Sequence, residues 1–260
     1  MALTMRLLLT NDDGIYAKGI EVLYEQLRRD HEVLVVAPET EQSAVGHAIT
    51  LMDPLRVKPV NRNRAFFGYA VNGTPADCVK LAIKELMEER PDLVVSGINL
   101  GANVGINVIY SGTVSAATEG TVLGVPAIAI SINSIRSPDF EPAAMFARSL
   151  ARKVAANSLP PRTLLNVNVP AVPAGEIKGV RVTRQGVTRF VERFERRVDP
   201  RDSVYYWQCG STPLLEEDGD TDGSALAAGY ISITPIHYDL TNYAFLEPLR
   251  EWVFPRVKSR

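Results

Sequence analysis

Short, continuous apolar runs alternate with helical patterns along most of this chain, and that alternation constrains the fold more than any other feature. The runs are bounded by turn residues; they are RLLLT (6–10), EVLVVA (32–37), DLVVSG (92–97), PAIAIS (126–131) and TLLNVNV (163–169). Continuous rather than alternating hydrophobicity indicates strands that are covered on both faces, as in a parallel sheet. The helical patterns between them cover residues 18–29, 76–89, 113–123 and 141–157. The sequence therefore predicts an α/β fold with an open, doubly wound sheet.

The chain changes character after about Pro170. Residues 179–210 are rich in Arg and Tyr and lack helical periodicity, which predicts strands and hairpins. We expect one domain over residues 1–260, with an α/β core over 1–175 that carries the site and a β-rich C-terminal extension over 176–260. Within the extension, Asp222 is predicted to cap a short helix.

Charge and cysteine content disfavour several classes of protein. The chain has 28 Lys and Arg against 30 Asp and Glu, so it lacks the basic surface of a protein that grips long nucleic acid. Its two cysteines, Cys78 and Cys209, have no metal-type spacing and indicate a reducing compartment. No stretch reaches the ~20 apolar residues of a membrane span, and the first apolar run is too short for a signal peptide. We expect a cytoplasmic protein with neither a membrane partner nor a long nucleic-acid partner.

Side chains with oxygen atoms follow three of the predicted strands. Asp12 and Asp13 follow the first strand, Ser43 follows the second, and Asn99 follows DLVVSG. Because ligands bind outside the carboxyl ends of the strands in a doubly wound sheet, these four side chains are predicted to converge on one rim. Their hard oxygen atoms suit Mg²⁺ or Mn²⁺ rather than zinc. A cation would offset the repulsion between adjacent carboxylates, although the pair alone also fits a turn, because Asn-Asp-Asp-Gly is good turn chemistry.

A second candidate lies where a loop enters a helix. Ser111, Gly112 and Thr113 open the pattern SGTVSAATEG, and the backbone N–H groups and positive dipole end of such a helix bind anions. Ser and Thr are also common at ordinary helix caps. The motif is therefore a candidate phosphate site only because a metal rim is predicted at the same edge of the sheet. The three histidines are scattered and form no ligand pair, although His47 lies close to Ser43.

Other functional classes lack their motifs. No GxSxG elbow, Walker P-loop or GxGxxG turn after the first strand occurs, which disfavours a serine hydrolase, an ATP hydrolase and an NAD enzyme. A receiver-like regulatory module, which binds metal without acting as an enzyme, also begins with an acidic pair after its first strand. A receiver needs an Asp where Ser96 and Gly97 stand, and a Lys that PAIAISINS does not supply, so this alternative is disfavoured.

Six ordered motifs resemble the SurE family of stationary-phase survival proteins, and the resemblance covers essentially the whole chain. The motifs are LLLTNDDGIYAKGI, APETEQSAVGHAIT, NGTPADCV, SGINLGANVGINVIYSGTVSAATEG, GVPAIAIS and TDGSALAAGYISITP. The resemblance implies a Rossmann-like core and a metal-dependent phosphatase for nucleoside 5'- and 3'-monophosphates, with short polyphosphate as a further substrate to test. One departure is Gln42, where many relatives carry a basic residue, and it bears on substrate preference.

The resemblance also implies roles for the residues of the rim. One divalent cation per subunit, Mg²⁺ or Mn²⁺, would be held by Asp12, Asp13, Ser43 and Asn99. Asp12 and Asp13 would be catalytic, and phosphate would be bound by Asn99, Ser111, Gly112 and Thr113. Two mechanisms stay open: in-line attack by a water that the metal orients, or a covalent intermediate on Asp12.

The extension is predicted to build a homodimer or homotetramer, as the resemblance implies. It carries large apolar side chains in segments too short to form a core of their own: Tyr205, Tyr206, Trp207, Leu249, Trp252 and Phe254. Apolar patches of that size on a soluble protein usually meet a partner. The alternative is that these side chains pack back on the core of their own subunit.

Overall fold

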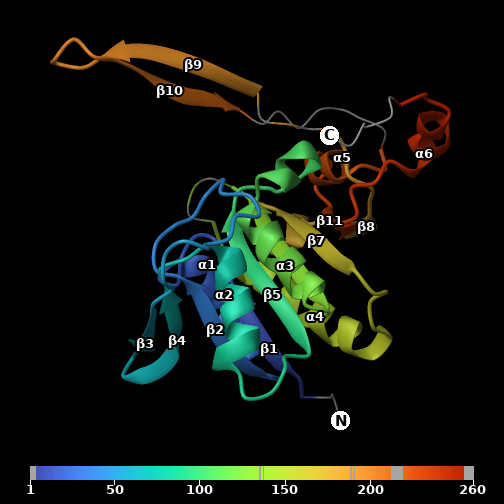
Figure 1. The fold of residues 1–260 in the computed structure, drawn as a ribbon. Helices are drawn as coiled ribbons and strands as arrows, with labels where there is room; N and C mark the ends of the chain where they lie inside the picture. The colour runs from blue at the N-terminus through green and yellow to red at the C-terminus, as the bar shows by residue number, and fades with distance from the viewer. Residues whose placement is uncertain are drawn as a thin grey trace, which may run out of the picture.

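The structure is a computed structural model, and it describes residues 4–134, 136, 138–187, 189, 191–211 and 219–254. A nine-stranded sheet lies at its centre (Figure 1). In order across the sheet, the strands are β3 (Val57–Arg62), β4 (Ala65–Val71), β2 (Glu32–Pro38), β1 (Arg6–Thr10), β5 (Leu93–Leu100), β6 (Ala127–Asn133), β7 (Thr163–Pro170), β11 (Ile231–His237) and β8 (Val180–Val182).

Most of this sheet is parallel. The six strands from β4 to β7 run parallel to one another, whereas β3 pairs antiparallel with β4, and β11 pairs antiparallel with β7. From β1 the chain moves to β2 on one side and later to β5 on the other, so the strand order reverses between β1 and β5. The predicted doubly wound, mainly parallel sheet is therefore confirmed, and the reversal marks the place where such sheets bind ligands.

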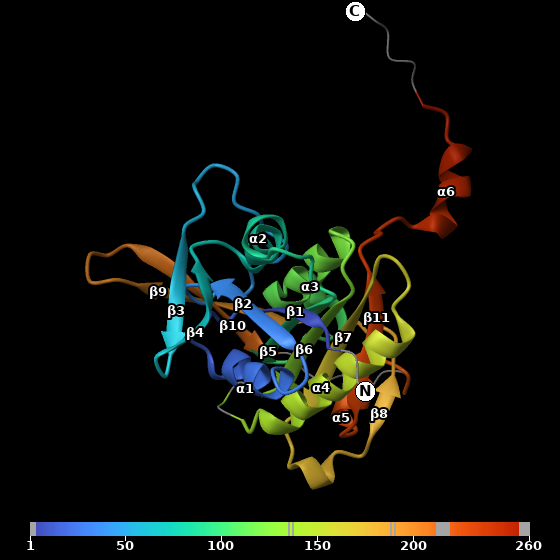
Figure 2. The same cartoon turned by 90° about the horizontal axis from the view of Figure 1, so that it is seen from below.

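Helices cover both faces of the sheet. The helices α1 (Lys18–Leu27) and α4 (Glu141–Asn157) pack on one face, and α2 (Pro75–Leu81) and α3 (Gly112–Val122) pack on the other (Figure 2). Leu7 and Leu9 of β1 belong to the apolar cluster of the first face, whereas Leu8 belongs to that of the second. A strand buried on both faces reads as a continuous apolar run. None of the described helices is long and apolar enough to cross a membrane.

Two strands, β3 and β4, have no counterpart among the predicted runs. The edge strand β3 exposes Lys58 and Pro59, so its sequence lacks the continuous apolar pattern of the inner strands. The predicted helix over 76–89 is also shorter than expected. Thr74 and Asp77 close a capping box at the start of α2, and the helix passes into a π-helical turn, η1 (Ala82–Leu86).

Part of the C-terminal extension joins the core, and part projects from it. The strands β8 and β11 extend the main sheet, with α5 (Asp222–Ala227) packed beside β11. The strands β9 (Val191–Val198) and β10 (Val204–Ser211) form a separate antiparallel hairpin, and α6 (Tyr243–Arg250) lies beyond β11 (Figure 1). Two short 3-10 turns lie between longer elements: η2 (Gly105–Ile109) precedes α3, and η3 (Ala174–Glu176) follows β7. The strands and hairpin predicted after residue 179 are therefore confirmed.

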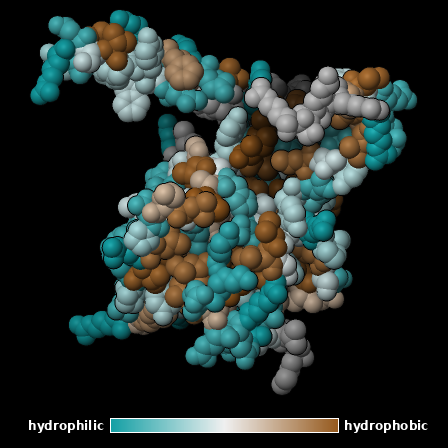
Figure 3. Space-filling model, in the orientation of Figure 1, coloured by the Kyte–Doolittle hydropathy of each residue, from teal (hydrophilic) through white to brown (hydrophobic). Residues whose placement is uncertain are grey.

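The large apolar side chains of the extension stay at the surface. Five of the six named above are exposed: Tyr205, Tyr206, Trp207, Trp252 and Phe254. The sixth, Leu249, is half-buried. In Figure 3, apolar residues stand among polar ones along the hairpin, clear of the main body. Within the described part of the subunit, these side chains do not enter the buried apolar clusters.

The predicted cap of α5 is wrong. The residue at the cap is Thr221, whose hydroxyl accepts a hydrogen bond from the Ser224 N–H, and Asp222 is the first residue of the helix. Asp222 is buried and accepts hydrogen bonds from the Gly105 and Gly186 N–H groups at 2.9 and 3.0 Å. It therefore connects the extension to η2 instead of capping the N-terminus of its own helix.

Candidate functional site

The carboxylate pair lies where the strand order of the sheet reverses. Asp12 and Asp13 directly follow β1, and Asn99 lies near the end of β5, the neighbour of β1 on the other side of the reversal. Thr10 and Ser96 are paired in register at the ends of these two strands. Parallel strands present their carboxyl ends at the same edge of a sheet, so the pairing brings the two segments to one rim.

Asp12 is packed under the first turn of α3. Its side chain is 4% exposed, and its Oδ1 accepts a hydrogen bond from the Thr113 hydroxyl at 2.5 Å. A Cβ atom on Gly112 would lie 2.7 Å from the Asp12 Cβ, so only glycine lets the helix approach this closely. The structure thus brings the predicted metal rim and the predicted phosphate segment into direct contact.

Burial and like charges act together on the two carboxyl groups. Burial raises the pKa of Asp12 from its ordinary value. Burial and the neighbouring Asp12 carboxylate raise the pKa of Asp13 to about 7. The charged neighbours that act on both groups are themselves carboxylates, since Glu41 raises the pKa of each. A site with this uncompensated negative character favours a cation.

Asn99 lies in the segment of β5 that contacts Asp13. Its Nδ2 donates to the Leu100 and Gly101 carbonyl oxygens at 3.2 and 2.8 Å, which leaves Oδ1 as the atom that can accept or bind a metal. The Leu100 N–H donates to the Asp13 Oδ2 at 3.3 Å, so Asp13 is held against the same segment. Asp12, Asp13 and Asn99 are therefore gathered as the sequence predicts.

The loop that carries Ser43 is attached to the rim through the backbone of Gln42. The Gln42 N–H donates to the Asp12 carbonyl oxygen at 2.8 Å, which places the loop after β2 beside the carboxylate pair. The Ser43 hydroxyl is exposed and donates to the Glu41 Oε1 at 2.5 Å. Glu41 is thus a third acidic group at the rim that the sequence motifs did not single out. It lies two residues from Ser43, a spacing with no signal of its own.

The start of α3 offers backbone groups to an anion, because its hydroxyl groups are already engaged. Ser111 caps the helix by accepting from the Val114 N–H at 3.1 Å, and the Thr113 hydroxyl donates to Asp12. The first N–H groups of a helix have no partner within it. The Val114 N–H is taken by Ser111, and the Thr113 amide is hydrogen-bonded to Asp12, so the Gly112 N–H is the first-turn donor that the described residues leave for a phosphate group.

Buried polar side chains hold the segment that leads into this helix. The Asn103 N–H donates to the Asn168 Oδ1 at 2.8 Å, and the Asn103 Nδ2 donates to the Ser131 hydroxyl at 2.8 Å. Asp222 and Gln185, from the extension, bind the Gly105 N–H and carbonyl groups. Sequence inspection missed these contacts because every partner comes from a distant part of the chain.

The donor set fits a hard divalent cation. Two carboxylates, one amide oxygen and one hydroxyl come from the three segments that meet at the rim, and Mg²⁺ accepts such oxygen atoms together with water. In the part of the chain that the structure describes, no cluster of three or more His, Cys, Asp or Glu side chains is arranged to hold a metal. A site completed by Ser and Asn oxygen atoms is compatible with the residues present.

Comparisons with known proteins agree with the fold and the motifs. The model of the family "Survival protein SurE" matches residues 7–192. The chain is 62% identical over 248 residues to the 5'-nucleotidase SurE of Syntrophobacter fumaroxidans, covering 95% of this chain and 99% of that protein. It is 60% identical over 247 residues to the 5'-nucleotidase SurE of Syntrophus aciditrophicus, with coverage of 95% and 93%. The crystal structure of the SurE protein from Aquifex aeolicus superposes with a TM-score of 0.83 at 42% identity, covering 94% of this chain and 98% of that one.

Proposed function

This chain belongs to the SurE family, and we propose that it is a divalent-metal-dependent phosphatase that hydrolyses nucleoside 5'- and 3'-monophosphates to nucleoside and phosphate. The observation that carries this proposal is the carboxylate pair beneath the first turn of α3. Asp12 and Asp13 are crowded, desolvated and surrounded by further negative charge. The amides of the same turn offer an anion site in contact with Asp12. A cation would neutralise the carboxylate pair, and a phosphate group would accept hydrogen bonds at the start of α3.

In this proposal, one Mg²⁺ or Mn²⁺ per subunit is held by Asp12, Asp13, Ser43 and Asn99. When bound, the ion supplies Lewis-acid polarisation of the phosphoryl group and activation of water. The Gly112 amide and the positive end of the α3 dipole bind the phosphoryl oxygen atoms and stabilise the charge that develops on them, with Thr113 beside them. Thr113 keeps Asp12 in place through its hydroxyl. Asn99 and Ser111 line the same phosphate site.

The reaction breaks the bond between phosphorus and the ester oxygen. In the direct mechanism, the oxygen of water forms the new bond to phosphorus, and the nucleoside oxygen takes up a proton as it leaves. In the alternative, Asp12 attacks first and water then releases phosphate from the aspartyl phosphate. One displacement inverts a chiral phosphorus and two displacements retain its configuration, so the stereochemical outcome distinguishes the two mechanisms. Trapping of a phosphoenzyme by acid quench supports the second.

A substrate panel tests the proposal against a receiver-like regulatory module. Purified protein is assayed with nucleoside 5'- and 3'-monophosphates, sugar phosphates and short polyphosphates, each with Mg²⁺, Mn²⁺ or EDTA. We expect release of phosphate from nucleotides with either metal and none in EDTA. Full activity in EDTA after dialysis contradicts the metal requirement. Binding of nucleotide without any release of phosphate supports the regulatory module instead.

We further propose that the chain assembles in the cytoplasm into a homodimer or homotetramer through its extension, residues 176–260, while residues 1–175 carry the site. All sixteen residues of β9 and β10 except Cys209 are exposed. A two-stranded hairpin alone is marginally stable in water, and exposed aromatic side chains favour contact with another surface. Sedimentation at micromolar concentration tests this assembly, and a monomer would contradict it.

A further inference from the structure

Ser43 lies in a short left-handed turn that is tied down on its upstream side. The residues that follow it, Ala44 and Gly46, both have φ of 58°. Glycine adopts this region readily, but alanine disfavours it because of its Cβ atom. Upstream of the turn, the Gln42 N–H is bound to the Asp12 carbonyl oxygen at 2.8 Å. A second attachment downstream of Ala44 would help the chain to keep this disfavoured conformation.

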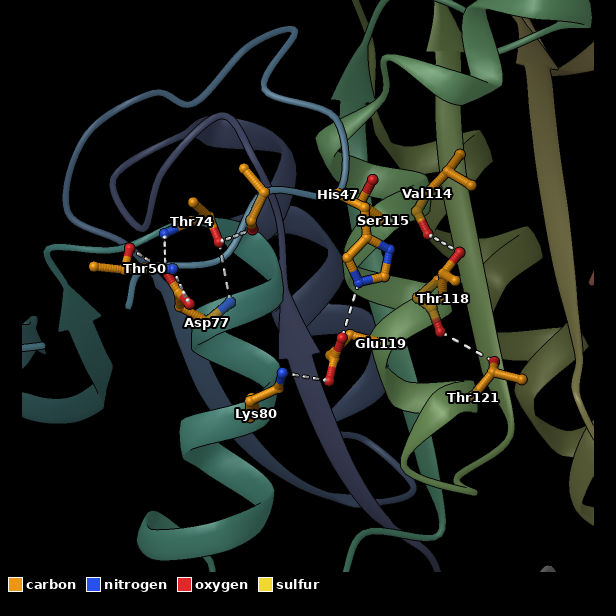
Figure 4. Close-up of polar contacts among 12 residues, drawn as sticks. His47, Thr50, Thr74, Asp77, Lys80, Val114, Ser115, Thr118, Glu119 and Thr121 are labelled. Carbon is orange, nitrogen blue, oxygen red and sulfur yellow. Dashed lines mark hydrogen bonds and ion pairs between the residues drawn. The ribbon is translucent and has the colours of Figure 1, made fainter. Parts of the chain in front are cut away.

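The downstream tie is made to α3. The Gly46 N–H donates to the Tyr110 carbonyl oxygen at 3.1 Å, just before the helix begins. The next residue, His47, places its Nε2 2.8 Å from the Glu119 Oε2 (Figure 4). The Glu119 side chain is only 5% exposed, whereas that of His47 is 36% exposed. The histidine thus reaches from the loop to a buried carboxylate in the body of the protein.

Glu119 is suited to act as an ionised acceptor at this position. Burial alone would raise its pKa, but the hydrogen bonds from His47 and Lys80 outweigh burial and lower the pKa of this carboxyl group. Lys80 of α2 lies 3.2 Å from the other carboxylate oxygen, Oε1. Each oxygen therefore has its own partner, one from the loop and one from a helix.

The same helix carries the anchor and the phosphate site. The first turn of α3 holds Gly112 and Thr113, which contact Asp12, and Glu119 lies two turns further along. A helix buried on nearly all sides is a rigid reference, so a loop fixed to Glu119 is fixed relative to Asp12. Beyond His47, the loop has a separate attachment, because Thr50 donates to Asp77 of α2 through both its N–H and its hydroxyl.

We propose that Glu119, acting through His47, is a positioning residue that holds Ser43 over the carboxylate pair and thereby raises the affinity of the rim for a divalent cation. In this role neither side chain binds the substrate or the metal ion. The inference rests on the metal site of the proposed function, and it adds a role for two residues to which the motifs assigned none. The affinity for the cation should depend on the hydrogen bond between His47 and Glu119, and not on the general packing of α2 against α3.

Binding of Mn²⁺ to the whole purified protein tests the link, with free Mn²⁺ counted by electron paramagnetic resonance. His47→Ala removes the anchor, and we expect its dissociation constant for Mn²⁺ to rise about tenfold. His47→Gln can still donate from its amide to Glu119, so we expect a rise of at most about twofold. If the alanine variant does not fold, His47→Asn, whose amide is one carbon too short to reach Glu119, makes the same comparison.

Lys80→Met is the matched control, because it removes the other partner of Glu119 without touching the loop. We expect it to lower the melting temperature and to leave the Mn²⁺ affinity within about twofold of wild type. Equal weakening by Lys80→Met and His47→Ala would mean that the cluster serves cohesion alone, and would overturn the proposal.

A rescue variant tests the left-handed turn itself. Glycine at position 44 populates φ > 0 about as readily as φ < 0, so it needs the anchor less than alanine does. We expect His47→Ala combined with Ala44→Gly to recover part of the lost Mn²⁺ affinity. Saturating Mn²⁺ is expected to restore the nucleotidase turnover of His47→Ala. If the double variant binds Mn²⁺ no better than His47→Ala, the turn is not the element that the anchor holds.

The results separate this proposal from the function on which it rests. Wild-type protein that binds no Mn²⁺ contradicts the proposed metal site, and the positioning role falls with it. Wild-type protein and His47→Ala that bind Mn²⁺ equally well leave the metal site intact and overturn the positioning role alone.

Discussion

The rim around Asp12 and the β9–β10 hairpin differ in how they are held: the rim by contacts between distant segments, the hairpin by the pairing of its own two strands. At the rim, β1, β5, α3 and the loop after β2 meet within hydrogen-bonding distance, and each is fixed by at least one of the others. In the hairpin, the strands pair with no other strand among the described residues, and almost every side chain is exposed. The contacts that hold the rim together thus lie within one subunit, whereas the hairpin leaves its side chains at the surface.

This difference predicts where substitutions act. A change at the rim should alter catalysis and metal binding while the assembly persists. A change on the hairpin should alter assembly while each site persists. Rim substitutions should therefore lower turnover without changing the mass of the assembly, and hairpin substitutions should do the reverse.

The largest effect is expected from Asp12→Asn. The substitution removes one of two adjacent carboxylates but keeps the size of the side chain and its place under α3. We expect phosphatase activity to fall by about a thousandfold or more, because a direct metal ligand is lost rather than an outer partner. Turnover of one nucleotide with Mn²⁺ measures this, with circular dichroism as the control for folding. Near-normal activity in folded Asp12→Asn would assign the pair to a structural turn.

Gly112→Ala tests whether the contact between α3 and Asp12 sets the geometry. Its Cβ atom would lie 2.7 Å from the Asp12 Cβ, so one of the two segments has to move. We expect activity to fall on the order of a hundredfold and stability to fall by about 1–3 kcal/mol. Gly175→Ala is the matched control, since nothing lies within 4 Å of the corresponding Cβ. Equal kinetics in the two variants would show that the approach of α3 is not needed.

The reverse pattern is expected on the hairpin. Tyr206→Ser combined with Trp207→Ser removes two exposed aromatic side chains from β10. We expect the sedimentation coefficient to fall to that of a smaller species, while turnover per subunit stays within about twofold, because no rim residue is touched. An unchanged assembly would mean that another surface holds the subunits together.

The smallest expected effect is a pH dependence of the metal-free protein. The pKa of Asp13 is raised to about 7 in the folded state from an ordinary value of 3.8. Between these values the folded protein binds more protons than the unfolded chain, so stability falls as pH rises from about 4 to about 7. We expect the melting temperature without metal to fall over this range more in wild type than in Asp13→Asn. Parallel pH profiles for the two proteins would contradict the raised pKa.

Sequence predicts those parts of the fold and rim that are encoded locally. Continuous apolar runs identify the buried parallel strands, and their ends place Asp12, Asp13 and Asn99 together without knowledge of any long-range contact. The edge strand β3 escapes this logic, because its exposed residues, such as Lys58, break the continuous apolar pattern. The role of Asp222 escapes it too, because its partners Gly105 and Gly186 lie far away in the chain.

The contacts of the Ser43 loop could not be predicted from the sequence for the same reason. His47 stands out only as a histidine near Ser43, and nothing in the sequence connects it to Glu119, which is 72 residues away. Glu119 itself looks like one polar residue in a helix of small residues. Only the packing of α3 against the loop after β2 brings the two together.

If the rim keeps two carboxylates together for a cation, melting curves of wild type and Asp13→Asn with and without Mn²⁺ will show it. At pH 7.5 without metal, we expect Asp13→Asn to melt at or above the temperature of wild type, because one of two crowded charges is gone. We also expect Mn²⁺ to raise the melting temperature of wild type and barely to change that of the variant, since only wild type binds the ion tightly in its native state. A variant that melts lower than wild type without metal, and that responds to Mn²⁺ as wild type does, would contradict the claim.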